Sequence, residues 1–376
     1  MADQSNVPPN QPVPAAPLIL HVFPTFAVGG AQVRFAALAN HFGPAFRHSV
    51  VSLDGALGTS ERLRPDLDIR FPPVAALKNA MLTSTLRFRR LLHDWSPSLL
   101  VTNNWGAIEW AMANLPPIAR HVHIEDGFGP EERNRQLRRR AWLRRLVLNR
   151  STVVLPSRTL QRIALTQWHL PPARVRYIAN GIDLARFAPR PATRAPADPP
   201  AIGTVAALRP EKNISRMLRA FALLPPPARL TIVGDGPERA MLQAEAQSLS
   251  ISERVRFTGH IDDPAPLYAG FDVFALSSDT EQMPLSVIEA MAAGLPVAAT
   301  DVGDVRAMLS PANAAFVGKP SETELARSLA ALLQAPGLRA SVGAENQAKA
   351  RAEFDQAAMF RAYEALWRDD FAAETA

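Results

Sequence analysis

A regular alternation of short apolar runs with longer helical patterns constrains the fold of this chain more than any other feature. The runs are rich in β-branched residues and recur through most of the sequence. Strands that alternate with helices in this way predict βαβ units and parallel sheets, and there are enough runs here for two sheets. We expect strands at residues 18–23, 48–53, 98–102, 121–124, 152–155 and 174–178, and at 201–208, 229–234, 254–257, 272–276 and 296–300.

The chain divides at a proline-rich stretch, FAPRPATRAPADPP, which fits neither a helix nor a central strand. A chain of 376 residues is also longer than one hydrophobic core usually serves. We therefore expect a disordered tail (1–17), an N-terminal Rossmann-like domain (18–186), a linker (187–200) and a C-terminal Rossmann-like domain (201–345). A last helix within residues 346–376 could pack on either half.

The composition excludes some classes of protein and favours others. There is no cysteine, the N-terminus lacks the features of a signal peptide, and no apolar stretch is long enough to span a bilayer. These features fit a cytoplasmic enzyme. The net charge is +6 and only four basic residues are lysines, a balance that favours anionic partners such as phosphates, nucleic acid or an acidic membrane face.

The segment TEQMPLSVIEAMAAGLPVAAT, residues 280–300, places two carboxylates where ligands bind in open α/β sheets. Glu281 falls in the loop after an expected strand, and Glu289 lies within the apolar helix that follows. Backbone amides near residues 283–286 would favour a phosphate there. The alternative is structural: Ser286 and Glu289 have the spacing of a capping box, and Glu281 would be a solvated loop residue.

Two further loops follow strands of the second half. In VAALRPEKN, Arg209 and Lys212 could meet the charge of a diphosphate, although a solvated turn is the simpler interpretation. In VGDGPER, Gly234 opens a tight turn. The third glycine of the dinucleotide fingerprint is missing, which disfavours an NAD-dependent dehydrogenase.

The first half offers weaker candidates. Gly29 and Gly30 form a side-chain-free loop before an expected helix, suited to the close approach of a phosphate or sugar. In HVHIEDGFG, His123 and Asp126 lie at a strand end, where a structural and a functional histidine are about equally expected. Asp66 and Asp68 have the D-x-D spacing used to hold a metal-nucleotide, but we interpret them as part of a surface turn. No other segment has metal-ligand spacing, and we expect no metal site.

The segment RNRQLRRRAWLRRLVLNR, residues 133–150, combines arginines with an apolar stripe through Leu137, Leu143 or Trp142, and Leu146. Such a helix is typical of membrane-surface or nucleic-acid binding. The alternative is a solvated helix face of an arginine-rich protein. The residues we assign to a membrane or acceptor are Arg138, Arg139, Arg140, Arg144 and Arg145.

Taken together, these motifs resemble the family 4 glycosyltransferases, which are retaining enzymes that use nucleotide sugars. The resemblance covers about residues 18–365 and rests on ALRPEKN, VGDGPE, RVRFTGHIDD and EQMPLSVIEAMAAGLPVAATDVGDV, with IANGID near the domain junction. It implies the GT-B architecture, in which two Rossmann-like, doubly wound parallel-sheet domains face a central cleft.

The resemblance also implies roles for residues. Glu281 and Glu289 match the family's E-x7-E, whose first glutamate reaches the donor sugar and whose second holds the ribose hydroxyls. Lys212 matches the lysine that binds the donor diphosphate. The other implied donor contacts are Gly30, Gly234, His260, Ile261, Met283, Pro284, Leu285 and Ser286. The nucleotide is UDP or GDP, and neither a cofactor nor a metal is implied.

Two positions depart from the family pattern. Its usual arginine is Ala207 here, and Arg209 is the candidate replacement. The family's histidine in the N-terminal domain corresponds to His123 or gives way to Asp126, and His123 is preferred. The expected catalytic residues are therefore Glu281, His123 and Lys212.

The resulting expectation is a glycosyltransferase that moves a sugar to a glycan or to a polyprenyl- or lipid-linked acceptor, in cell-surface polysaccharide or glycolipid synthesis. It would be cytoplasmic or peripheral on the inner face of the membrane. One rival is a nucleotide-sugar epimerase of the same architecture, which would need no acceptor. A nucleic-acid binder is disfavoured, because it would leave the E-x7-E and the Lys212 loop unexplained.

Overall fold

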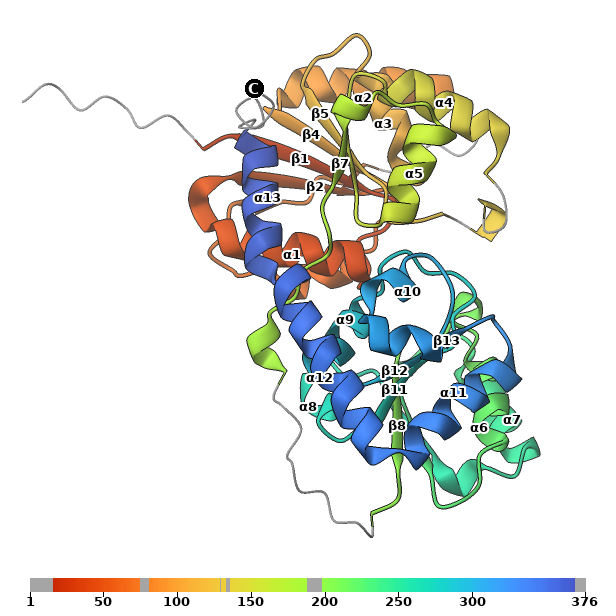
Figure 1. Ribbon diagram of the computed structural model, residues 1–376. Helices are drawn as coiled ribbons and strands as arrows, with labels where there is room; N and C mark the ends of the chain where they lie inside the picture. The colour runs from red at the N-terminus through yellow and green to blue at the C-terminus, as the bar shows by residue number, and fades with distance from the viewer. Residues whose placement is uncertain (1–15, 75–80, 129, 133–135, 188–197, 369–376) are drawn as a thin grey trace, which may run out of the picture. The chain divides into compact units, whose positions relative to one another are not determined.

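The computed structural model describes residues 16–74, 81–128, 130–132, 136–187 and 198–368. The described residues pack as two compact units, one lying within residues 1–102 and 109–121 and the other within residues 103–108 and 122–376. Two parallel sheets with Rossmann-like strand orders run through it (Figure 1). Within the described ranges, no helix is both long and apolar enough to cross a bilayer.

The first sheet has seven strands in the order β3-β2-β1-β4-β5-β6-β7. The strands are β1 (Leu18–Phe23), β2 (Arg47–Ser52), β3 (Ile69–Arg70), β4 (Leu99–Asn103), β5 (Arg120–Ile124), β6 (Thr152–Leu155) and β7 (Val175–Tyr177). The helices between them are α1 (Gly30–Phe42), α2 (Met81–Trp95), α3 (Ile108–Ala113), α4 (Arg138–Leu148) and α5 (Arg158–Thr166).

Aromatic residues make much of the core of the first unit. Phe23 and Val50, from β1 and β2, pack with Phe35 and Ala39, which lie one turn apart on α1. Helix α1 ends at Phe42, where Gly43 takes a φ of +53°, a conformation that favours glycine.

The second sheet has six strands in the order β10-β9-β8-β11-β12-β13. They are β8 (Ala201–Val205), β9 (Arg229–Val233), β10 (Val255–Gly259), β11 (Val273–Leu276), β12 (Val297–Thr300) and β13 (Val317–Gly318). The helices are α6 (Ile214–Ala222), α7 (Arg239–Ser248), α8 (Ala265–Tyr268), α9 (Leu285–Ala292), α10 (Val305–Met308), α11 (Glu322–Gln334), α12 (Pro336–Glu353) and α13 (Gln356–Arg368).

Helices cover both faces of this second sheet. Along β11, Phe274 and Leu276 enter the core that includes α9, whereas Val273 and Ala275 enter the core that includes α6 and α11. Figure 1 shows α6 and α11 on one side of the strands and α9 and α12 on the other. Burial on both faces explains why this strand reads as an uninterrupted apolar run.

All eleven expected strands are present, with ends within a few residues of those expected. Strands β3 and β13 were not predicted, because two residues are too few to show a period. The single helix expected near the C-terminus is wrong: α12 and α13 are separate, and the Asp355 carboxylate accepts a hydrogen bond from the Ala357 amide at the start of α13. The expected tail and linker lie largely outside the described residues.

Candidate active site

The strand order of the second sheet reverses between β8 and β11, so the loops after these two strands leave a crevice at the carboxyl edge. Lys212 ends a short 3-10 turn in the first loop, and Glu281 lies in the second. The Lys212 Nζ is 2.6 Å from the Glu281 Oε1, across 69 residues of sequence. The structure therefore brings together the two residues that sequence analysis placed at a diphosphate and a sugar.

The carboxylate of Glu281 is largely enclosed. Its side chain is 9% exposed and that of Lys212 is 25% exposed. The same Oε1 atom also accepts a hydrogen bond from the Ser278 hydroxyl at 2.7 Å. Solvent therefore reaches Lys212 more than it reaches the carboxylate of Glu281. An incoming anion could draw the lysine away from that carboxylate.

Arg216 on α6 fastens the two loops to each other. Its guanidinium lies 2.6 Å from the Asp279 Oδ1 and donates to the Ser277 carbonyl at 2.7 Å. The Asp279 amide in turn donates to the Glu211 carbonyl at 2.9 Å. Sequence analysis missed Arg216 and Asp279, because nothing in their local pattern separates them from ordinary surface charges.

Glycines allow the loops to approach backbone to backbone. A Cβ at Gly234 would lie 2.0 Å from the Ala206 carbonyl oxygen, and Gly234 has a φ of +135°. A Cβ at Gly303 would lie 2.0 Å from the Glu281 carbonyl oxygen, with a φ of +57°. Gly234 therefore has a structural reason to be glycine, and Gly303, which sequence analysis did not single out, sets the position of the Glu281 backbone.

Glu289 is held by a tyrosine. It lies in the second turn of α9, and the Tyr268 hydroxyl donates to its Oε2 at 2.5 Å. Burial raises the pKa of the Glu289 carboxyl, and the hydrogen bond from Tyr268 offsets part of that rise. Burial also raises the pKa of Tyr268 well above its ordinary value. The capping-box alternative is wrong, since the N-cap of α9 is Pro284 and has no side-chain cap.

The segment from Met283 to Ser286 leads into α9. The Met283 carbonyl accepts from the Asn180 side-chain amide at 3.1 Å, which anchors the segment. The Val287 amide turns back to the Pro284 carbonyl at 3.2 Å. The amides of Leu285 and Ser286 belong to the first turn, which has no acceptor within its own helix.

The side chains of the remaining predicted donor contacts are not part of this hydrogen-bonded group of residues. The Arg209 side chain is exposed and makes no hydrogen bond within the described ranges, so its part in place of Ala207 stays a prediction. His260 is exposed beside Asp262, at 3.2 Å, and Ile261 packs against the core. Gly30 begins α1 in the first unit, and its role as a donor contact also stays a prediction.

His123 is enclosed inside its unit rather than presented at a surface. Its side chain is 0% exposed, and its Nε2 lies 3.6 Å from the Glu125 Oε2, which is equally buried. Asp126 is partly exposed, and its amide donates to the Asn104 side chain at 2.7 Å. The structure gives His123 no access to a substrate, so of the two candidates Asp126 fits the role better.

The assignment of Arg144 to a membrane or acceptor is wrong. Its side chain is 0% exposed and forms ion pairs with Glu125 at 3.3 Å and Glu132 at 3.2 Å. Its guanidinium carbon also lies 4.8 Å from the ring centres of both Trp105 and Trp168. This arginine is a core residue that neutralises two buried carboxylates.

The Arg140 side chain is likewise mostly buried and paired with acids. Its side chain is 16% exposed and pairs with Glu131 at 2.5 Å and with Glu132 at 3.3 Å. It also lies over Trp105. Two acids just before the arginine-rich segment thus take up part of its charge. Arg138, Arg139 and Arg145 are exposed, and their assignment to a membrane or acceptor stays a prediction.

Asp304 caps a helix beside the Glu281 loop. Its carboxylate accepts hydrogen bonds from the first two amides of α5, those of Arg158 and Thr159, the second at 3.0 Å. Its own amide donates to the Gln282 carbonyl at 3.0 Å. The loop that carries Glu281 is thus tied to α5.

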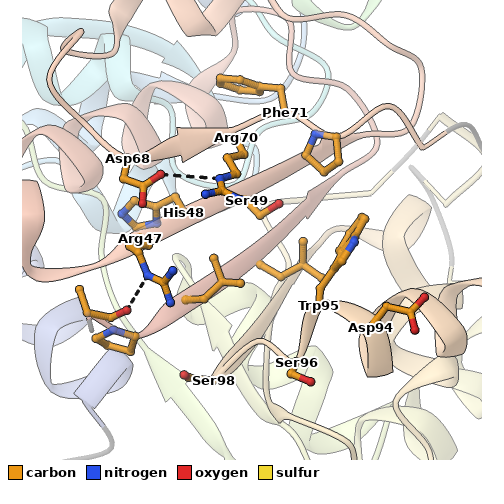
Figure 2. A pocket seen from close by; sticks show the side chains of 15 residues that line it. Arg47, His48, Ser49, Asp68, Arg70, Phe71, Asp94, Trp95, Ser96 and Ser98 are labelled. Carbon is orange, nitrogen blue, oxygen red and sulfur yellow. Dashed lines mark hydrogen bonds and ion pairs between the residues drawn. The ribbon is translucent and has the colours of Figure 1, made fainter. Parts of the chain in front are cut away.

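A cavity of about 700 Å³ lies in the first unit, at the amino ends of β1 and β2. Figure 2 shows Arg47, Arg70 and Trp95 around it. Arg47 donates to the Ala16 carbonyl at 2.8 Å, and Arg70 lies 3.9 Å from Asp68. Ligands of open α/β sheets bind at the carboxyl ends of strands, so this cavity is not the predicted site.

The fold and the loops define a doubly wound α/β protein with a paired cation and carboxylate at its switch point. Two family models match it: Glycosyltransferase Family 4 over residues 28–186, and Glycosyl transferases group 1 over residues 186–349. The chain belongs to the family 4 glycosyltransferases.

Relatives and solved structures agree with this placement. The chain is 32% identical over 230 residues to a GDP-mannose-dependent alpha-mannosyltransferase of Mycobacterium tuberculosis (strain CDC 1551 / Oshkosh), which covers 59% of this chain and 58% of that relative. It is 30% identical over 281 residues to a D-inositol 3-phosphate glycosyltransferase of Salinispora tropica, covering 67% and 57%. The matches thus span a little over half of these relatives' own length.

A similar fold occurs in HepE of Anabaena, which was solved in complex with UDP and glucose. The TM-score is 0.78 at 20% identity, over 94% of this chain and all of that one. At this identity, the likeness concerns the GT-B fold.

Proposed function

We propose that this protein transfers a hexosyl group from a UDP or GDP sugar to a glycan or lipid-linked acceptor, with retention of the anomeric configuration and without a metal. The proposal rests on one observation above all, the ion pair between Lys212 and Glu281 at the switch point. Family membership supports the reaction class. We also propose that the product belongs to cell-surface polysaccharide or glycolipid synthesis.

Without a donor, Lys212 and Glu281 neutralise each other. A diphosphate carries more negative charge than one carboxylate and would compete for the lysine. The exchange leaves Lys212 on the diphosphate and turns Glu281 toward the sugar. Positive charge that develops at the anomeric carbon would then lie near a carboxylate that solvent screens little.

The leaving nucleoside diphosphate gathers negative charge as the bond breaks. Lys212 and the first amides of α9 would stabilise that charge, and the dipole of α9 adds to the effect. Arg209, whose side chain is exposed, is a further candidate cation for the diphosphate. Charges fixed in place before the reaction cost no reorganisation when the bond breaks.

Glu289 is proposed to accept hydrogen bonds from the two ribose hydroxyls of the nucleotide. One of its oxygens already accepts from Tyr268, which fixes the direction of the carboxylate. A partly buried carboxylate is tolerated in this apolar helix because Tyr268, and then the ribose, donate to it.

The nucleotide is proposed from the relatives. One matched relative is named for GDP-mannose, and HepE was solved with UDP. A thermal-shift screen against UDP and GDP sugars would identify the base, since a ligand that binds only the folded state raises the melting temperature. The expected result is a shift with one nucleotide series that is lost in Lys212→Ala.

The decisive experiment is turnover of Glu281→Gln with the donor found by that screen. Glutamine keeps the shape of the side chain and removes its charge, so the rate should fall by at least about a hundredfold while the melting temperature stays close to that of the wild type. Glu253→Gln, at an exposed glutamate in the 3-10 turn just before β10, is the matched control. Near-normal turnover of Glu281→Gln would refute the role given to this residue.

A further inference from the structure

The outer face of α4 is a part of the arginine-rich segment that the core does not use. At 100° per residue, the exposed side chains of this helix fall within one arc of about 120°. In order around the arc they are Arg145, Arg138, Trp142, Leu146 and Arg139. We call this arc the α4 face.

Two large apolar side chains form the centre of the α4 face. Trp142 is 62% exposed and Leu146 is 51% exposed, and they lie one turn apart. A single exposed leucine is unremarkable on a protein surface, whereas a tryptophan and a leucine stacked on one helix and flanked by cations form a defined patch.

The charge of the α4 face is uniformly positive. Arg138 and Arg145 border the apolar centre on one side and Arg139 on the other, and Arg150 follows two residues after the helix ends. None of these four side chains has an ion pair with the described residues, and α4 itself contains no acidic residue. The paired arginines, Arg140 and Arg144, point elsewhere and contribute nothing to this charge.

We propose that the α4 face binds an anionic lipid bilayer, with Trp142 and Leu146 in the interface and the arginines on lipid phosphates. A tryptophan suits the boundary between acyl chains and headgroups, and arginine stems can lie along apolar surface while their guanidinium groups stay in the polar layer. A nucleic acid would use the arginines but would gain nothing from Leu146. This surface would hold the protein peripherally at the inner face of the membrane.

The test is flotation of the full chain with phosphatidylcholine vesicles that contain or lack phosphatidylglycerol. The wild type should float with the anionic vesicles only, and less as salt is raised. Arg138→Glu with Arg145→Glu should reduce partitioning by more than about tenfold, since each cation near an anionic surface is worth about fivefold. Trp142→Ala with Leu146→Ala should reduce it without changing the net charge.

Each pair of substitutions has a matched control. Arg351→Glu with Arg361→Glu makes the same change of charge at exposed arginines on α12 and α13. Leu223→Ala with Met241→Ala removes exposed apolar groups elsewhere, which are 60% and 48% exposed. Equal loss in a test pair and its control would overturn the proposal, as would equal flotation with neutral vesicles.

Two further measurements separate membrane binding by the α4 face from catalysis and from nucleic-acid binding. Glu281→Gln should float like the wild type, so a failure of catalysis and a failure of membrane binding can be told apart. Filter binding to a duplex DNA at physiological salt should show no effect of the α4 face. If DNA binding were lost in Arg138→Glu with Arg145→Glu while the wild type failed to float, the surface would be a nucleic-acid site instead.

Discussion

The ε-amino group of Lys212 lies 2.6 Å from a carboxylate oxygen of Glu281, and the two residues come from loops that leave different strands. Each therefore holds the other in place when no ligand is bound. A substitution at one of them alters the surroundings of the other as well, so both kinetics and stability must be measured for each variant.

Lys212→Ala should raise the KM for the donor and lower kcat/KM by about a hundredfold or more, because a fixed cation at the diphosphate is lost. Its cost in stability should be small, on the order of 1 kcal/mol, since solvent reaches the lysine, which is 25% exposed, and Glu281 keeps its hydrogen bond from Ser278. Steady-state kinetics and urea unfolding measure the two effects. Lys319→Ala, at an exposed lysine, is the control, and identical kinetics for both variants would remove Lys212 from the site.

Gly303→Ala should displace the backbone of Glu281 and reduce turnover at least about tenfold, because its Cβ would lie 2.0 Å from the Glu281 carbonyl oxygen. Gly43→Ala is a closely matched control. Gly43 has a φ of +53°, against +57° for Gly303, but a Cβ there would meet no atom within 4 Å. Both alanines carry the strain of a positive φ, so a loss of turnover in Gly303→Ala that is absent from Gly43→Ala is assigned to the clash.

Glu289 should make stability depend on pH. Burial raises its pKa above the ordinary value of 4.5, so between that value and the raised pKa the folded state binds more protons than the unfolded state. The free energy of unfolding therefore falls as pH rises through this range. Glu289→Gln should remove this fall, and urea unfolding between pH 4 and pH 8 would reveal the difference.

Tyr268→Phe should extend the same effect to higher pH. The hydrogen bond from Tyr268 lowers the pKa of Glu289, so its loss lets burial raise that pKa further. In the double variant with Glu289→Gln, the additional pH dependence should vanish. If Tyr268→Phe shifted stability equally at every pH, the hydroxyl would not be coupled to the ionisation of Glu289.

Arg144→Met should destabilise the fold by about 3–5 kcal/mol, because Glu125 and Glu132 would be left buried without their cation. Arg145→Met, next along the helix but exposed, should change the free energy of unfolding by no more than about 0.5 kcal/mol. Urea unfolding of both variants checks the prediction. A comparable effect of the two substitutions would contradict the assignment of Arg144 to the core.

The sequence was sufficient for those features that depend on local pattern together with topology. β-Branched apolar runs marked the strands, and polar loops after β8 and β11 marked the site. Because a doubly wound sheet has one switch point, residues as distant as Lys212 and Glu281 could be expected near each other.

What the sequence could not reveal depends on contacts between distant segments. Arg144 has the same local setting as Arg145, and only the acids at Glu125 and Glu132 and the rings of two tryptophans decide that one is core and the other surface. Similarly, the need for glycine at 303 arises from a carbonyl more than twenty residues earlier. A buried His123 cannot be told from an accessible one by its place at a strand end.

The hydrogen bonds from α5 to Asp304 make the N-terminus of this helix differ from that of α9. The first amides of α5 are already bound to a carboxylate of the protein, so an arriving phosphate would have to displace a resident anion there. The start of α9 carries no such side chain. By capping α5 with its own carboxylate and leaving α9 without a side-chain cap, the chain keeps the first amides of α9 available to an anion while those of α5 are occupied.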